Sequence, residues 1–175
     1  MDFFDLHCDT LTECMDDGDS LLKNERDIDF ERGSIFGRWN QVFAVFVPDS
    51  MDDSLVEGYF DSACNFYFDE LKKKGDVFPI LSSEDVRGHS RGVMLAMESS
   101  RGVGSLERLE KLYERGLRLI TLTWNHKNRA AGGCDEGGGL TDWGRELVSK
   151  MEKLGIVTDV SHLSDRSFYD LCEFS

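Results

Sequence analysis

Basic residues are scarce in this sequence. Lys and Arg together number 20 against 34 Asp and Glu, which gives a formal net charge of −14. Binding to a nucleic-acid backbone or to an anionic membrane surface requires clustered Lys and Arg. We therefore expect neither a nucleic acid nor a membrane as a partner.

Long apolar runs are also missing. No stretch approaches the roughly 20 consecutive apolar residues that a membrane-spanning helix needs. Met1 and Asp2 lead directly into a predicted strand, without the basic and apolar segments of a secretory signal. We therefore expect a chain without a signal peptide.

Paired cysteines are the third absence. The cysteines are odd in number and none belongs to a C-x-x-C pair: Cys8, Cys14, Cys64, Cys134 and Cys172. Disulfides are rare in the reducing cytosol, where such widely spaced thiols stay free. This pattern predicts free thiols and a cytoplasmic location.

What the sequence does contain is enough for a folded core. Hydrophobic residues make up 40% and aromatic residues 11%, which argues against disorder. A length of 175 residues, without linker or repeat, predicts one domain over residues 1–175. The glycine-rich segment 132–139 is either a mobile loop near a site or a plain surface loop.

Apolar runs alternate with helical patterns along the chain. The runs predict strands at residues 3–8, 42–47, 93–97, 117–122 and 156–160. The helical spacing predicts helices at 55–74 before Gly75, at 105–115 before Gly116, from Thr141 or Asp142 to Gly155, and after Ser164. This alternation indicates a parallel α/β architecture.

The first predicted strand carries a trio of polar residues. Asp5, His7 and Asp9 occupy alternate positions, so in an extended strand they share one face, while Cys8 points to the other. Buried charges are tolerated mainly when they are paired or bound to a cation. The trio is thus either a metal site or a strand end that meets solvent.

Other predicted strands also end in polar residues. Glu98 ends the strand 93–97, His126 follows 117–122, and His162 follows 156–160. Active sites of parallel α/β folds lie at this carboxyl edge. Taken singly, Glu98 also fits a helix cap and His162 a core histidine. Together, imidazole and carboxylate without thiolate suit Zn²⁺ or a similar metal in an open hydrolytic site.

His89 is the fourth histidine of the sequence. It precedes the third predicted strand, so we expect it at the opposite end of the sheet and leave it out of the site.

Six motifs support a family resemblance. They are DLHCDT (5–10), VFAVFVP (42–48), AME (96–98), LITLTWN (119–125), GGLTDWG (138–144) and DVSHLSD (159–165). In this order and combination the chain resembles the membrane (renal) dipeptidase family of zinc metallopeptidases. The resemblance implies a (β/α)₈ TIM-type barrel, incomplete here with about five βα units.

The resemblance also implies the chemistry and the site. Family members hydrolyse dipeptides, including those with a C-terminal D-residue, at a centre of two zinc ions. By motif match, His7 and Asp9 are ligands of the first zinc, Glu98 bridges both ions, and His162 is a ligand of the second. His126 corresponds to a substrate-contacting catalytic histidine, with Trp124 as the alternative for that position, and Asp5 could orient a metal ligand.

The extent of the match sets further expectations. Family members carry further site residues on later strands, after the part of the family sequence that residues 1–175 match. These are a second histidine for the second zinc and an arginine and an aspartate that bind substrate. We therefore expect an N-terminal part of a barrel, one or two zinc ions per chain, and low activity from residues 1–175 alone. Its possible protein partners are further copies of the same chain, in a homo-oligomer, or a separate C-terminal portion of the barrel.

Two alternatives stay open. The chain could be an inactive fragment or a module that depends on a partner. It could also be another barrel metallohydrolase, although those commonly begin with a His-x-His strand, and here Asp9 holds the second position.

Overall fold

The computed structural model describes residues 1–174. The chain forms two compact units. The first contains Met1–Phe46 and Tyr59–Ala96, and the second contains Val47–Gly58 and the chain from Met97 onward. The strand order is β1-β2-β4-β5-β6, with β3 paired to β4 off this path.

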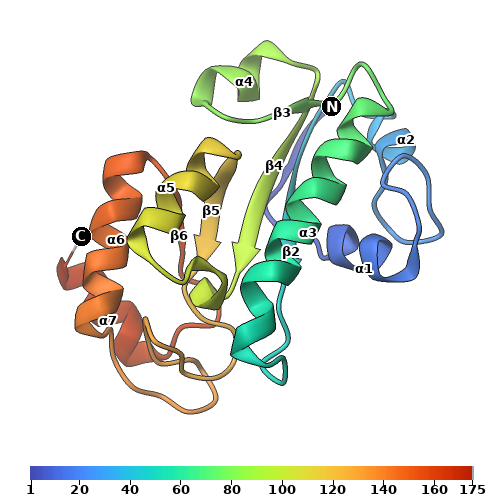
Figure 1. Ribbon diagram of the computed structural model, residues 1–175. Helices are drawn as coiled ribbons and strands as arrows, with labels where there is room; N and C mark the ends of the chain where they lie inside the picture. The colour runs from blue at the N-terminus through green and yellow to red at the C-terminus, as the bar shows by residue number, and fades with distance from the viewer. Residues whose placement is uncertain (175) are drawn as a thin grey trace. The chain divides into compact units, whose positions relative to one another are not determined.

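The first unit is built on parallel strands. Its strands are β1 (Asp2–Asp5), β2 (Arg38–Phe46), β3 (Phe78–Pro79) and most of β4 (Arg91–Glu98), and its helices are α1 (Thr10–Asp17), α2 (Phe30–Gly33), α4 (Ser83–Gly88) and the larger part of α3 (Asp53–Lys72). β1 pairs with β2, where Asp5 lies opposite Gln41, and β3 pairs with β4. Figure 1 shows α3 running alongside β2.

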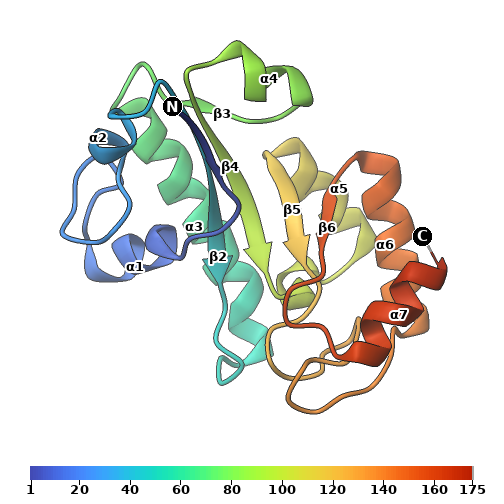
Figure 2. The same ribbon diagram turned by 180° about the vertical axis from the view of Figure 1, so that it is seen from behind.

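The second unit continues the alternation. It contains the end of β4, the 3₁₀-helix η1 (Ser100–Val103), α5 (Leu106–Glu114), β5 (Leu117–Thr121), α6 (Asp142–Leu154), β6 (Val157–Asp159) and α7 (Asp165–Phe174). β5 and β6 are parallel, with Thr121 opposite Asp159. Seen from behind, β5, β6 and the helices that follow them lie together (Figure 2).

An aromatic cluster forms part of the core of the first unit. The rings of Phe30, Trp39 and Phe43 meet edge to face with centroids 6.1–6.5 Å apart. Such pairs contribute about 0.5–1.5 kcal/mol each beyond their buried area. Gly33 lies so close that an added Cβ would be 2.4 Å from the Trp39 ring. The close packing of this ring therefore requires a glycine.

The predicted helix ends of the second unit are confirmed. Ser105 accepts a hydrogen bond from the Arg108 amide at the start of α5, and Thr141 accepts one from Gly144 at the start of α6. Gly155 ends α6 with φ of 79°, a left-handed conformation that costs glycine little. The sequence signals for these helices are local, and the structure follows them.

Several element boundaries differ from the prediction. The short helices α1, α2, α4 and η1 were not predicted, because four to eight residues hold too few apolar positions for a helical period. The predicted helix 55–74 begins at Asp53 and ends at Lys72, three residues before Gly75.

The first strand also ends early. β1 stops at Asp5, although the Cys8 amide donates to the Val42 carbonyl at 3.1 Å and the Cys8 carbonyl accepts from Ala44 at 2.9 Å. Asp5 Oδ1 instead accepts the backbone N–H of His7 at 3.4 Å. Asp9 has helical backbone angles at the start of α1. The prediction that Asp5, His7 and Asp9 share one face of a continuous strand is therefore wrong.

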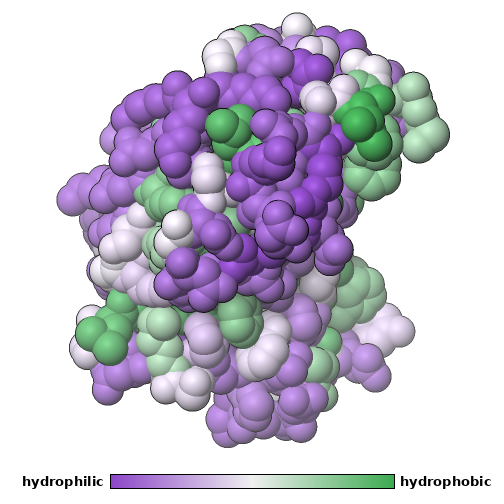
Figure 3. Space-filling view, turned by 90° about the vertical axis from the view of Figure 1, so that its right-hand side faces the viewer, coloured by the Kyte–Doolittle hydropathy of each residue, from purple (hydrophilic) through white to green (hydrophobic). Residues whose placement is uncertain are grey.

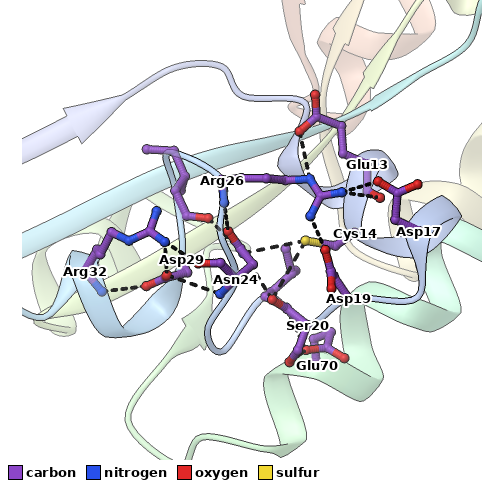
Figure 4. A network of polar contacts seen from close by, with 12 residues as sticks. Glu13, Cys14, Asp17, Asp19, Ser20, Asn24, Arg26, Asp29, Arg32 and Glu70 are labelled. Atoms are coloured by element: carbon purple, nitrogen blue, oxygen red, sulfur yellow. Dashed lines mark hydrogen bonds and ion pairs between the residues drawn. The ribbon is translucent and has the colours of Figure 1, made fainter.

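An irregular loop between α1 and α2 is held by side chains (Figure 4). Arg26 forms ion pairs with Glu13, Asp17 and Asp19. The buried carboxylate of Glu70 accepts hydrogen bonds from the Ser20 hydroxyl at 2.5 Å and the Leu21 amide at 2.9 Å. These side-chain contacts supply hydrogen-bond partners to polar groups of the loop, which lacks the backbone hydrogen bonds of a helix or strand.

Among residues 1–174, no helix combines the length and the apolar character needed to cross a membrane.

Candidate metal centre

His7 and Asp9 form a pair in the first unit. His7 Nε2 lies 3.3 Å from Asp9 Oδ1. Asp9 is the N-cap of α1, where a carboxylate usually accepts a hydrogen bond from the first helical turn. Its side chain makes no such bond, so its oxygen is directed to the histidine instead. The pair presents one nitrogen and one oxygen donor.

Cys8 lies between these two residues but is unsuited to ligation. Burial raises the pKa of its thiol to about 12. The thiolate is the form that binds metals, and at this pKa it is scarce near neutral pH. The prediction that Cys8 serves packing is consistent with this protonated state.

Glu98 and His162 form a second pair, within the second unit. Glu98 ends β4, and only 4% of the residue is exposed. His162 follows β6, and its Nε2 lies 3.3 Å from Glu98 Oε1. A buried carboxylate requires a compensating positive charge or hydrogen bonds. Protonated histidine or a bound cation would each supply that charge.

The backbone is unusual at His162 and at the residue that follows Glu98. Ser99, directly after Glu98, has φ of 78°, and His162 itself has φ of 64°. Non-glycine residues adopt such angles at a cost of about 1–3 kcal/mol, and only where their surroundings hold them. The His162 carbonyl accepts hydrogen bonds from the Cys134 amide at 2.9 Å and the Thr123 hydroxyl at 3.2 Å.

The donor chemistry of both pairs fits zinc. Zinc binds histidine nitrogen and carboxylate oxygen at about 2.0–2.2 Å with tetrahedral angles, which separates two ligand atoms by roughly 3.3 Å. Both nitrogen–oxygen pairs show a distance of 3.3 Å. Each pair could therefore bind one ion without rearrangement of its own two atoms.

His126 lies in a different setting from the other histidines. Its Nδ1 is 2.7 Å from Asp49 Oδ2, and this hydrogen bond raises the pKa of the ring above its ordinary value of 6.5. Both residues line a pocket of about 680 Å³ together with Lys127, Arg129 and others, but without Glu98 or His162. The sequence did not single out Asp49, although it closely follows the strand 42–47.

Trp124 lies beside His162 of the second pair. Its ring centroid lies 6.2 Å from that of His162, with the ring planes tilted by 47°. The sequence left Trp124 and His126 as alternatives for the substrate-contacting position. Of the two, Trp124 has the ring contact with a proposed ligand, and the substrate role of His126 stays a prediction.

The glycine-rich segment is tied to its surroundings. The Ser164 hydroxyl donates to the Gly138 carbonyl at 2.6 Å, and the Ser167 hydroxyl donates to Gly132 at 2.9 Å. An isolated bridge also joins Gly133 to Leu163. These contacts attach the segment to the start of α7, beside His162.

Asp5 is linked to the first pair through the backbone. It accepts the His7 amide through Oδ1, and Oδ2 accepts a hydrogen bond from Gln41 Nε2 at 3.0 Å. The orienting role predicted for Asp5 thus has a physical route, through the main chain of His7. The sequence gave no signal for Gln41, which lies beside Asp5 only through strand pairing.

A parallel α/β fold with these strand ends places the chain among TIM-type barrels, of which it forms a part. The model of the family described as membrane dipeptidase (peptidase family M19) matches residues 1–175. The chain belongs to this family.

Solved structures agree with the fold. One crystal structure is titled as dipeptidase AC, a metallo peptidase. It is 20% identical in sequence with a TM-score of 0.88, and the match covers 100% of this chain and 60% of that chain. A metallo peptidase from Rhodobacter sphaeroides, liganded with a phosphinate mimic of the dipeptide L-Ala-D-Ala, is 19% identical with a TM-score of 0.87. This match covers 100% of this chain and 62% of that chain. At these identities the likeness shows the fold.

A curated relative matches in sequence over a shorter span. An uncharacterized dipeptidase of Schizosaccharomyces pombe is 39% identical over 72 residues, which are 38% of this chain and 17% of that protein. The chain thus spans less than two thirds of the length of the proteins to which it is similar.

Proposed function

We propose that this chain takes part in the metal-dependent hydrolysis of dipeptides, at a dinuclear zinc site that tolerates a C-terminal D-residue. The family match over residues 1–175 supports dipeptide hydrolysis. The observation that carries the metal proposal is the pair of 3.3 Å nitrogen–oxygen contacts, His7 with Asp9 and His162 with Glu98.

The proposal assigns each ligand a role. His7 and Asp9 would hold the first zinc, His162 the second, and Glu98 would bridge both. Two bound zinc ions supply Lewis-acid polarisation of a carbonyl and lower the pKa of a water toward neutrality. The first ion has three of these ligands and the second has two, so we expect one tight zinc per chain and a weaker second one.

His126 is proposed to contact the substrate. Its pKa is raised by Asp49, so more of the ring is protonated near neutral pH than in an ordinary histidine. Asp49 engages Nδ1, which leaves Nε2 as the N–H donor for a developing oxyanion. Tolerance of a D-residue draws support from the R. sphaeroides neighbour, whose bound ligand mimics L-Ala-D-Ala.

The location is proposed to be cytoplasmic. Within residues 1–174 the five cysteines form no disulfide, as expected in a reducing compartment. Fusion of the full chain to a fluorescent protein, followed by fractionation, tests this. Recovery in the membrane or extracellular fraction would contradict it.

The test of function is zinc-dependent release of D-alanine from L-Ala-D-Ala. Because low activity is expected, the readout is its dependence on zinc rather than its rate. Chelation and dialysis should abolish release, and added zinc should restore it. Glu98→Gln should remove it, because an amide is a weaker metal ligand than a carboxylate.

Glu84→Gln is the matched control, since Glu84 is exposed on α4. It should behave as the wild type does. Release that survives chelation or the Glu98→Gln change would overturn the proposal, and so would the absence of release from zinc-loaded wild type at high protein concentration.

A further inference from the structure

We propose that Asn125 is a positioning residue that keeps Nε2 of His162 free for a metal ion. The inference deepens the proposed function and, for its consequence in metal binding, rests on it. Its geometric basis lies wholly within the second unit, in the loop after β5 and the turn after β6.

The two nitrogens of His162 face different partners. Nδ1 lies 2.9 Å from Asn125 Oδ1, while Nε2 lies 3.3 Å from Glu98 Oε1. An N–H···O hydrogen bond is usually 2.7–3.2 Å long, with the commonest values near 2.9–3.0 Å. The contact with Asn125 therefore has the commonest length of a hydrogen bond, whereas the contact with Glu98 lies just beyond the usual range.

These distances favour one position for the proton of the neutral ring. An amide oxygen can only accept, so Nδ1 carries the proton and donates it to Asn125. Nε2 then presents a lone pair toward the carboxylate of Glu98. Two acceptors at 3.3 Å repel each other unless a cation lies between them. The arrangement is unfavourable when empty and suited to a metal.

Glu98 competes for the same proton. If Nε2 carried it, the ring would donate a charge-assisted hydrogen bond to Glu98, and such bonds are roughly twice as strong as neutral ones. That tautomer offers no lone pair to a metal at Nε2. At 3.3 Å that alternative bond is longer than the 2.7–2.9 Å usual for a charge-assisted one, whereas the acceptor on Asn125 at 2.9 Å holds the proton at the opposite nitrogen.

Asn125 is itself fixed by its backbone. Its carbonyl accepts the Asp135 amide at 2.9 Å. Gly133 packs against the same carbonyl, and an added Cβ there would be 2.4 Å away. The Cys134 thiol also lies 3.6 Å from Asn125 Oδ1, in keeping with an acceptor at that position. The glycine-rich segment thus supports the residue that orients His162.

The tautomer can be read directly by nitrogen NMR. With four histidines in the sequence, long-range ¹H–¹⁵N spectra are simple, and His162→Gln assigns the ring. Spectra are recorded without metal at about pH 9, well above the ordinary imidazole pKa of about 6.5. Wild type should show Nε2 unprotonated, and Asn125→Ala should show the proton moved to Nε2.

Asn125→Asp is the conservative variant, because it keeps an oxygen acceptor at the same reach. It should restore the wild-type tautomer. In a zinc titration, the affinity for the second zinc, which His162 is proposed to bind, should be about 10–100-fold lower in Asn125→Ala than in wild type. This is the usual effect of losing a hydrogen-bond partner of a ligand, and Asn125→Asp should recover the affinity.

Asn128→Ala controls for loosening of the loop. Asn128 donates to the Leu122 carbonyl and accepts from the Ala130 amide, both at 2.8 Å, without a bond to His162. It should lower the melting temperature and leave the tautomer unchanged. A proton on Nε2 in wild type, or a tautomer that Asn125→Ala leaves as it was or Asn128→Ala moves equally, would overturn the proposal.

The two proposals fail separately. If no variant binds zinc but the tautomers follow Asn125, the metal function fails and the positioning role stands. If wild type binds zinc and its tautomer does not depend on Asn125, the positioning role fails alone.

Discussion

The proposed ligands differ in their exposure at the residue scale. The side chains of His7 and Asp9 are 38% and 46% exposed, whereas that of Glu98 is 5% exposed. Exposed charged pairs contribute little to stability, commonly 0–1 kcal/mol. Replacement of His7 should therefore affect metal binding far more than folding.

We expect His7→Ala to lose most of the tightly bound zinc while its helix content stays as in wild type. Zinc is measured by elemental analysis after dialysis, and helix content by circular dichroism. His89→Ala is the matched control, because His89 stacks on Phe78 and is no proposed ligand. Equal zinc in wild type and His7→Ala would refute the assignment.

A second residue-scale prediction concerns pH. The hydrogen bond from His126 to Asp49 raises the folded-state pKa of His126 above the unfolded value near 6.5. The stability that this pair contributes is fully present below that value and is lost as pH rises through the raised pKa.

Asp49→Asn should return the pKa of His126 toward its ordinary value. A ¹H–¹⁵N titration of the ring follows it directly, with His89 as the internal reference. An unchanged His126 titration in the variant would show that Asp49 is not the cause.

At the scale of elements, the glycine-rich segment carries more structure than its composition suggests. Gly133 has no room for a Cβ beside the Asn125 carbonyl, and Gly132 has none beside the Gly137 carbonyl. Composition predicted a loop but not these backbone contacts, since they depend on the path that the loop takes in the folded chain.

We expect Gly133→Ala to destabilise the protein by about 1–3 kcal/mol, because the new methyl group must push the backbone of Asn125 away. Denaturant unfolding measures the loss. Gly58→Ala is the control: Gly58 lies inside α3 with open space around its Cβ position. That change should raise stability by up to about 1 kcal/mol through helix propensity. Equal effects of the two changes would contradict the steric argument.

Charge dominates at the scale of the whole molecule. The net charge of −14 gives repulsion between copies, and the face in Figure 3 is largely hydrophilic with scattered hydrophobic residues. The edge of the sheet at β1, by contrast, favours association between copies. It pairs with β2 at one end of the strand order, and Phe4 and Leu6 beside that edge are 40% and 64% exposed. Exposed apolar edge strands invite association.

We expect association at micromolar concentration that increases with salt, because salt screens the repulsion over about 10 Å at 0.1 M. Leu6→Lys should reduce association, since a lysine at a strand edge opposes pairing. Leu55→Lys makes the same charge change at a comparably exposed leucine on α3 and should reduce it less. Light scattering measures both, and a sharp wild-type monomer at all salt concentrations would contradict the prediction.

The sequence alone determined the features that depend on neighbouring residues. Apolar runs marked five of the six strands, and cap residues such as Thr141 and Gly155 marked the ends of α6, because these signals act within a few residues. β3 was missed, since a two-residue strand has no pattern of its own. The sequence also indicated His7, Asp9, Glu98 and His162 as candidate ligands, through strand ends and family motifs.

Only the tertiary structure decided which side chains meet. The contacts of Asn125 with His162, of His126 with Asp49 and of Gln41 with Asp5 join residues 36 to 77 positions apart. No local pattern encodes such pairs, because they depend on which strands become neighbours and on where each connecting loop returns.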